Sequence, residues 1–135
     1  MLRAMRAVVT AAEAAQVQLV MENHNHGGFV QTADDVLAIF DAVSSPALAL
    51  LLDTGNYVDG LASIRRTAGL ARHVHAKFRQ VGPDGRDRLV DHEAVVGELR
   101  QAGYQGCLSV EYEGEEPPES AVPRAVAHMR HILEG

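Results

Sequence analysis

The stretch ALALLLDTGN, residues 47–56, carries an unbroken apolar run that stops at a carboxylate, Asp53. A run without polar alternation is typical of a strand covered on both faces, as in parallel sheets. Three other short apolar runs each lead into a side chain that can bind a divalent metal: VQLVMENH (17–24) with Glu22, ARHVHAK (71–77) with His75, and GCLSVEYE (106–113) with Glu111. Because the carboxyl ends of parallel strands open on one face, we expect these four side chains to converge.

Segments with helical character alternate with the four runs. Residues 2–15 are rich in Ala, Arg, Met and Glu, and Thr32 with Asp35 has the spacing of a capping box. The expected helices cover residues 2–15, about 33–43, about 61–70, a segment that Asp91 caps and Gly103 ends, and about 119–133. This alternation predicts an α/β fold with about four parallel strands, in one domain over residues 1–135.

Composition excludes several classes of protein. The chain has 135 residues and a formal net charge of −6, and no basic cluster exceeds the pair Arg65 and Arg66. These features argue against a nucleic-acid partner and an anionic membrane surface. No apolar run reaches the length needed to span a bilayer, and the first residues lack a signal-peptide pattern. Cys107 is the only cysteine, so we expect no intramolecular disulfide, a cytoplasmic location, and a buried Cys107 that acts as a small apolar side chain.

The side chains that end the four runs form an oxygen-rich set of three carboxylates and one imidazole. Such a set suits Mn²⁺ or Mg²⁺ best, with Co²⁺ or Zn²⁺ as alternatives. Taken singly, each residue has another reading, because a carboxylate after a strand is often a helix cap or an ion-pair partner. The recurrence of the pattern at four equivalent positions favours a metal site.

Other polar residues beside these positions are candidates for substrate contacts. His73 lies two residues before His75, and His24 lies two residues after Glu22, so each pair shares a face of an extended strand. Lys77 can polarise a substrate oxygen, or it is simply an exposed lysine at a strand end. Three further histidines on the expected helices are assigned to the solvated surface: His92, His128 and His131.

The motifs MENH, LLLDTGN, HVHAK and AGYQGCLSVEYEG resemble the carboxyl-terminal half of the xylose isomerase-like TIM barrels. This sugar phosphate isomerase/epimerase group includes hydroxypyruvate isomerases, inosose dehydratases, ketose 3-epimerases and endonuclease-IV-type repair enzymes. The resemblance covers nearly the whole chain, and the last motif is the most specific. The acidic charge disfavours the DNA-repair branch.

The resemblance implies that Glu22, Asp53, His75 and Glu111 bind one divalent metal. It also implies that Glu22 and Glu111 exchange a proton with the substrate, through an enediolate that the metal stabilises. Two positions depart from many family members, which have a histidine where this chain has Asn56 and an aspartate where it has Phe78. Asn56 is therefore a candidate substrate contact, with an amide where many family members have an imidazole.

The resulting hypothesis is a metal-dependent isomerase or epimerase acting on a small sugar, sugar acid or sugar phosphate. The alternatives are an inosose-type dehydratase on the same scaffold and a non-catalytic, truncated half-barrel. Four strands are half of an eight-stranded barrel, which typically needs about 250 residues. We therefore expect the barrel to be completed by a second copy in a homodimer or by a missing amino-terminal half.

Overall fold

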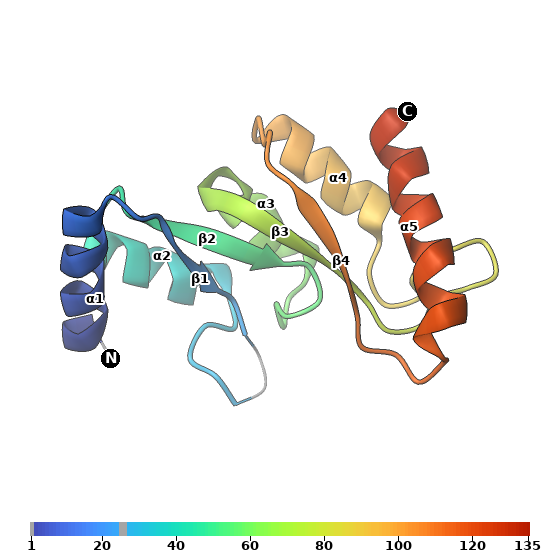
Figure 1. Cartoon of the computed structure of the whole chain (residues 1–135), viewed down its shortest axis with the longest axis horizontal. Helices are drawn as coiled ribbons and strands as arrows, with labels where there is room; N and C mark the ends of the chain where they lie inside the picture. Colours follow the sequence, from blue (N-terminus) through green and yellow to red (C-terminus); the bar gives the residue numbers. More distant parts are fainter. Residues whose placement is uncertain (1, 25–26) are drawn as a thin grey trace.

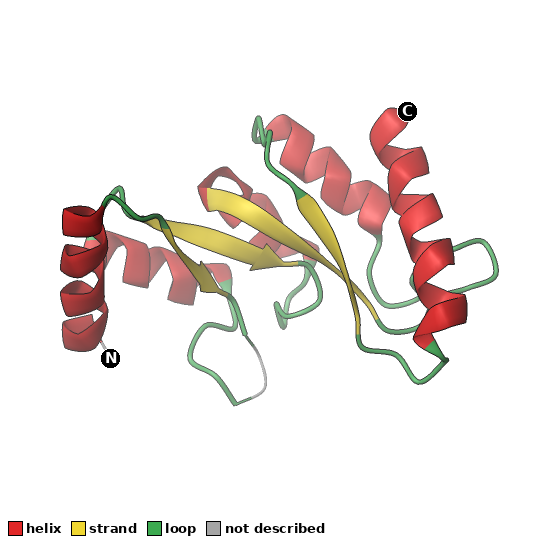
Figure 2. Cartoon of the chain, viewed as in Figure 1, coloured by secondary structure: helices red, strands yellow, loops and turns green. Residues whose placement is uncertain are grey.

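Strands and helices alternate along the chain (Figures 1 and 2). The structure is a computed structural model that describes residues 2–24 and 27–135. Its elements are α1 (Leu2–Ala15), β1 (Leu19–Glu22), α2 (Ala33–Val43), β2 (Leu48–Asp53), α3 (Leu61–Thr67), a 3₁₀ turn (Ala68–Leu70), β3 (Ala71–Phe78), α4 (His92–Gln101), β4 (Leu108–Tyr112) and α5 (Pro118–Glu134). Among these helices, none is both long enough and apolar enough to cross a membrane.

The four strands form one parallel sheet in the order β1-β2-β3-β4. Each strand is followed by a helix before the next strand begins, so neighbours in the sheet are also consecutive in the chain. This is the arrangement of βα units in half of a (β/α)₈ barrel. The predicted α/β class and the number of strands are confirmed.

The helices lie along the outside of the curved sheet as a row in which each helix contacts the next (Figure 1). Leu50, Leu52 and Val74 point to this side and pack in the core with Val36 and Ile64. Strand residues alternate between two faces, so their neighbours point to the opposite, inner face.

The inner face of the sheet has no covering layer among the described residues, and this corrects the expectation of strands buried on both sides. Val20, on β1, is 43% exposed, and β1 alternates between half-buried and exposed positions. Cys107 is exposed, not buried, because it immediately precedes β4 and alternates with Leu108, which packs toward the helices. Half a barrel leaves its interior open to solvent.

The helix starts follow local sequence signals. Thr32 and Asp35 form a complete capping box at the start of α2. The Asp91 side chain accepts a hydrogen bond from the Ala94 backbone N–H at the start of α4. Gly103, just past the end of α4, has a φ of +73°, a conformation that favours glycine. These predicted caps are confirmed.

His92 is buried, and this corrects its assignment to the surface. Its ring stacks on Phe78 at a centroid distance of 4.1 Å, so it packs as a flat aromatic group between α4 and β3. His128, on α5, is also buried, whereas His131 is exposed as expected. Helical periodicity alone does not show which helix packs over which strand.

Burial lowers the pKa of His92 to about 4, with a further small lowering by His128. Asp87 and Asp91 act in the opposite direction and are outweighed. His92 is therefore neutral in the folded protein at pH values where an unfolded chain, with a pKa of 6.5, already binds the proton. Stability from this residue is present above pH 6.5 and is lost as the pH falls toward about 4.

Replacing His92 with Phe keeps the stacked ring and removes the titration. We expect the wild type to lose about 3 kcal/mol more stability than H92F between pH 7 and pH 4, measured by urea unfolding at several pH values. Parallel stability curves for the two proteins would contradict this account of His92.

Candidate metal centre

The four residues that end the apolar runs meet at the carboxyl-terminal edge of the sheet. Glu22 and Asp53 are the last residues of β1 and β2, while His75 and Glu111 lie in the later parts of β3 and β4. One donor atom from each of the four lies within 4.8 Å of the others. The parallel register produces this arrangement, because Asp53 pairs with His75 and places both side chains on the inner face.

His75 lies at the centre of the cluster. Its Nδ1 is 3.1 Å from Glu111 Oε2, 3.3 Å from Glu22 Oε1 and 4.0 Å from Asp53 Oδ2. Three of these atoms, His75 Nδ1, Asp53 Oδ2 and Glu111 Oε2, are buried without a hydrogen-bond partner. Buried polar atoms without hydrogen bonds are costly. The Lys77 ammonium forms ion pairs with the two carboxylate oxygens but not with His75 Nδ1, and a shared cation would satisfy all three atoms at once. The donor set therefore fits a divalent metal that prefers oxygen and imidazole ligands.

Asp53 is held by its neighbours on several sides. The Asn23 side chain donates to the Asp53 carbonyl oxygen at 2.9 Å and accepts from the Asp53 backbone N–H at 2.8 Å. The Gly55 backbone N–H donates to Asp53 Oδ1 at 2.8 Å. These bonds leave Oδ2 directed at the cluster, so the protein's own groups hold the backbone and one carboxylate oxygen in place.

Lys77 places a buried ammonium beside the cluster. Its Nζ lies 3.2 Å from Asp53 Oδ2, 2.9 Å from Glu111 Oε2 and 2.8 Å from Glu113 Oε1. The side chain is only 3% exposed, so the reading as an exposed lysine is wrong. The strand continues to Phe78 and buries the stem of Lys77, whereas the sequence pattern suggested that the strand ended near this residue.

Glu113 is part of this network and was not identified from the sequence. It accepts from Lys77 and, through Oε2, from Arg79 at 3.2 Å. A signal was available, since Glu113 follows Glu111 by two residues and so continues the same face of the extended chain. The motif VEYE thus supplies two carboxylates, one to the cluster and one to the lysine.

The ionisable groups in this region shift one another's pKa values. Burial raises the pKa of Asp53, although the Gly55 N–H and Lys77 oppose that shift. Burial also acts to raise the pKa of Glu111, but the nearby Lys77 ammonium and the contact with Asp53 outweigh it, so the net pKa is lowered. For Lys77, burial opposes the charge, but the three carboxylates prevail and the pKa of the ammonium is raised. Lys77 therefore stays positively charged at neutral pH.

The other predicted substrate contacts lie around the cluster in different roles. His73 lies on the inner face two residues before His75, farther from the carboxyl-terminal edge of the sheet. Its ring centroid is 5.5 Å from that of His75, and its Nε2 is 2.9 Å from Ser109 Oγ. Asn56 is buried, and its amide donates to the Asn23 carbonyl oxygen at 3.2 Å. His24 is exposed, and its backbone N–H donates to Val30. Their contacts with a substrate stay predictions.

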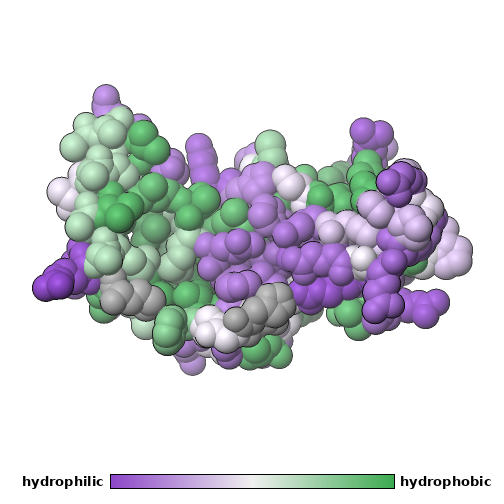
Figure 3. Space-filling model, turned by 60° about the horizontal axis from the view of Figure 1, so that its bottom comes forward, coloured by the Kyte–Doolittle hydropathy of each residue, from purple (hydrophilic) through white to green (hydrophobic). Residues whose placement is uncertain are grey.

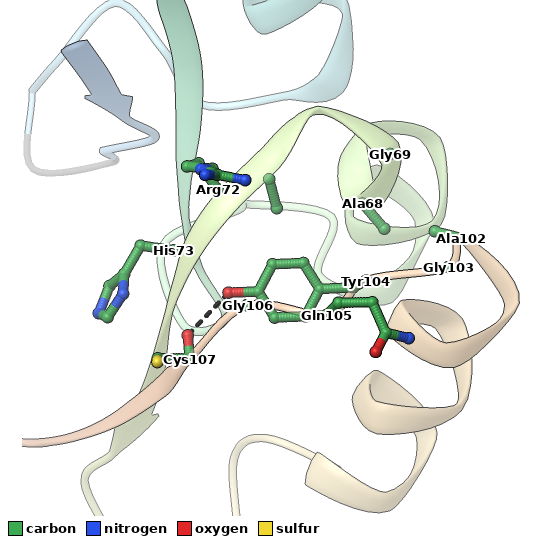
Figure 4. Close-up of a pocket in the computed structure, with 11 residues that line it drawn as sticks. Ala68, Gly69, Arg72, His73, Ala102, Gly103, Tyr104, Gln105, Gly106 and Cys107 are labelled. Carbon is green, nitrogen blue, oxygen red and sulfur yellow. Dashed lines mark hydrogen bonds between the residues drawn. The ribbon is translucent and has the colours of Figure 1, made fainter. Parts of the chain in front are cut away.

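A cavity of about 480 Å³ lies at the opposite end of β3 and β4 (Figure 4). Its lining includes Arg72, His73 and Cys107, and the Tyr104 hydroxyl donates to the Cys107 carbonyl oxygen at 2.7 Å. In barrels of this type the chemistry takes place at the carboxyl-terminal face, not at this amino-terminal face. The metal cluster is therefore the better candidate site.

Comparison with known proteins places these observations in context. The sequence matches the family described as "Xylose isomerase-like TIM barrel" over residues 1–132. It is 24% identical to an inosose dehydratase of Clostridium perfringens (strain 13 / Type A), over 83% of this chain and 46% of the relative. A shorter match, 33% identical over 69 residues, covers 46% of this chain and 20% of the C-glycoside deglycosidase alpha subunit of Arthrobacter globiformis.

The fold is similar to that of solved sugar epimerases. An L-ribulose 3-epimerase superposes with a TM-score of 0.82 and 25% identity, over 98% of this chain and 52% of the epimerase. The chain thus spans about half the length of this epimerase and less than half of the two curated relatives.

The hydrogen bonds between Asn23 and Asp53 give a test of how the site is held. Replacing Asn23 with Ala leaves a buried N–H and a buried carbonyl without partners, and we expect a loss of about 2 to 4 kcal/mol in the free energy of unfolding. The matched control is Gln18→Ala, because Gln18 bonds to the Pro46 carbonyl oxygen between the same two strands but at an exposed position. We expect Gln18→Ala to lower the free energy of unfolding by less than about 1 kcal/mol, measured by urea denaturation. Equal losses for both variants would rule out a special role for Asn23.

Proposed function

The chain belongs to the xylose isomerase-like TIM barrel family, and we propose that it is the metal-binding half of a sugar isomerase or epimerase. The observation that carries the proposal is the meeting of Glu22, Asp53, His75 and Glu111 at the carboxyl-terminal edge of the sheet. This is the edge where barrels of this kind perform their chemistry. Similarity to a solved L-ribulose 3-epimerase supports a sugar as the substrate class.

The four side chains differ in exposure, and this suggests a division of roles. The Asp53 side chain is fully buried and the His75 side chain is 25% exposed. The side chains of Glu22 and Glu111 are 40% and 32% exposed, so a substrate can reach them. We assign Asp53 and His75 to holding the metal, and Glu22 and Glu111 to both metal binding and proton transfer.

Mn²⁺ or Mg²⁺ fits this donor set best, with Co²⁺ or Zn²⁺ as alternatives. When bound, a divalent cation polarises a carbonyl oxygen and makes the neighbouring C–H bond more acidic. The carboxylate of Glu22 or Glu111 then takes the proton from that carbon, and the bonding electron pair moves toward the carbonyl oxygen. The other glutamate returns a proton to the same carbon in an epimerase or to the adjacent carbon in an isomerase.

The inosose dehydratase relative favours a second candidate function. A dehydratase uses the same first step, in which a carboxylate removes a proton next to a carbonyl. The neighbouring hydroxyl group then leaves as water, with a proton supplied by a general acid, and the electron pair forms a double bond. The two functions differ in the fate of the substrate and not in the residues that hold the metal.

We further propose that a second half-barrel covers the inner face of the sheet. Hydrophobic residues gather at the end formed by α1 and β1 (Figure 3), where Val8, Val17 and Val20 are among the exposed large apolar side chains. An apolar groove between α1 and β1 includes Met5 and Val9, and the outer edges of β1 and β4 are unpaired in the described sheet. Exposed strand edges and apolar surface favour association. The second half is either another copy of this chain or an amino-terminal half.

Calorimetry with Mn²⁺ tests the metal site. We expect wild-type protein to bind one Mn²⁺ per cluster. Loss of an outer-shell partner weakens metal binding by up to about 100-fold, so Glu111→Gln, which removes a ligand itself, should weaken binding by more than about 100-fold. The control is Glu115→Gln, which removes the same charge at an exposed position four residues away. A folded wild-type protein that binds no Mn²⁺ would favour the non-catalytic half-barrel.

Protein that binds Mn²⁺ can then be incubated with ketoses in D₂O. An isomerase or epimerase incorporates deuterium at the carbon next to the carbonyl, which NMR detects, and Glu22→Gln and Glu111→Gln should each abolish the exchange. With an inosose, a dehydratase instead yields a product that has lost one water. If neither reaction occurs in protein with a complete barrel, the proposed activity is wrong.

Sedimentation at micromolar concentration tests the second half-barrel. If two copies complete the barrel, the mass is twice the 14.5 kDa of the chain. Replacing the exposed Val20 with Lys should then return the protein to monomers, while Val58→Lys, at another exposed valine, should not. A monomeric wild type would rule out the homodimer and leave the amino-terminal half as the proposed partner.

A further inference from the structure

Lys77 occupies an unusual position, because its ammonium contacts two members of the metal cluster and one carboxylate outside it. The cluster members are Asp53 and Glu111, at 3.2 and 2.9 Å from Nζ, and the outside carboxylate is Glu113, at 2.8 Å. A divalent cation and an ammonium attract the same carboxylates and repel each other. Metal binding therefore depends on where the ammonium is held.

The stem of Lys77 has little freedom to move away. A Cβ atom added at Gly55 would lie 2.6 Å from Lys77 Cγ and 2.9 Å from Lys77 Cβ, so the stem lies directly against the glycine backbone. The Lys77 backbone N–H also donates to Thr54 Oγ1 at 2.9 Å. Gly55 thus provides the space through which the lysine reaches the site. The side chain is only 3% exposed, so the packed stem directs the ammonium into the site.

Glu113 is the partner that lies outside the cluster, and it is itself anchored. Its Oε1 accepts from Lys77 Nζ at 2.8 Å, while its Oε2 accepts from Arg79 Nη2 at 3.2 Å. Arg79 Nη1 in turn donates to the Gly55 carbonyl oxygen at 3.3 Å. This chain of contacts holds the Glu113 carboxylate beside the ammonium with a second partner, Arg79, that is not part of the cluster.

We propose that Glu113 is a positioning residue that gives the Lys77 ammonium a partner outside the metal cluster, so that the ammonium can give up Asp53 and Glu111 to a metal. With Glu113 in place, the ammonium keeps a full carboxylate partner when a divalent cation takes Asp53 and Glu111. Without it, the ammonium has only the metal ligands as partners and competes with the metal for them. The inference rests on the proposed metal site, and it concerns a residue that does not itself bind the metal.

Mn²⁺ calorimetry on four proteins forms a double-mutant cycle: wild type, Glu113→Gln, Lys77→Met, and the double variant. We expect Glu113→Gln to raise the Kd for Mn²⁺ about tenfold in the wild-type background, in the range for outer-shell residues. In the Lys77→Met background the same change should alter the Kd by less than about twofold, because no ammonium is left to position. An equal loss in both backgrounds would overturn the proposal and indicate a general effect of charge.

A second pair of variants keeps the test decisive if Lys77→Met does not fold. Glu113→Asp retains the negative charge but shortens its reach to Lys77, whereas Glu115→Gln removes a nearby exposed charge without touching Lys77. Positioning predicts that Glu113→Asp weakens Mn²⁺ binding severalfold and that Glu115→Gln does not. Unchanged affinity in Glu113→Asp would overturn the proposal.

These outcomes separate the inference from the proposed function. If wild-type protein binds no Mn²⁺, the metal site itself is wrong, and the role of Glu113 falls with it. If wild type binds Mn²⁺ and Glu113→Gln binds it equally well, the metal site stands and the positioning role is wrong.

Discussion

The buried carboxylate of Asp53 is the group on which the polar side of this structure depends. A charged side chain without solvent is strongly unfavourable unless neighbouring groups compensate for the lost hydration. Here the Asn23 side chain bonds both the backbone N–H and the carbonyl oxygen of Asp53, Gly55 bonds one carboxylate oxygen, and Lys77 faces the other. Three separate strands or loops are therefore committed to a single carboxylate, and this defines the geometry at the carboxyl-terminal edge of the sheet.

The same arrangement organises the charges around the site. The ammonium of Lys77 partly balances the negative charge that Asp53, Glu111 and Glu113 bring together. Glu22 lies on the edge strand β1 and is the most exposed member of the cluster. One side of the site thus has its negative charge partly balanced, while the other side is more exposed. This asymmetry supports the proposed metal-assisted proton transfer, since such a reaction needs fixed ligands and an accessible base.

The one-sided covering of the sheet is the second constraint. The helices bury Leu50, Leu52 and Val74 on the outer face, while the inner face carries the site at one end and exposed side chains elsewhere. In a complete barrel the inner side chains fill the interior. The chain spans about half of the L-ribulose 3-epimerase that it resembles, which is consistent with half of such a barrel. The open face and the open side of the site both follow from a sheet that, among the described residues, carries helices on one side only.

The sequence by itself determined the order of strands and helices, the caps at Thr32 and Asp91, and the four residues that meet in the cluster. These features follow from local periodicity and from the rule that parallel strands end on one face, so they need no knowledge of packing. Only the tertiary structure decided that His92 and Lys77 are buried, that Cys107 is exposed, and that Glu113 holds the lysine. Burial and ion pairing depend on which elements lie against each other, and side-chain patterns along one segment do not contain that information.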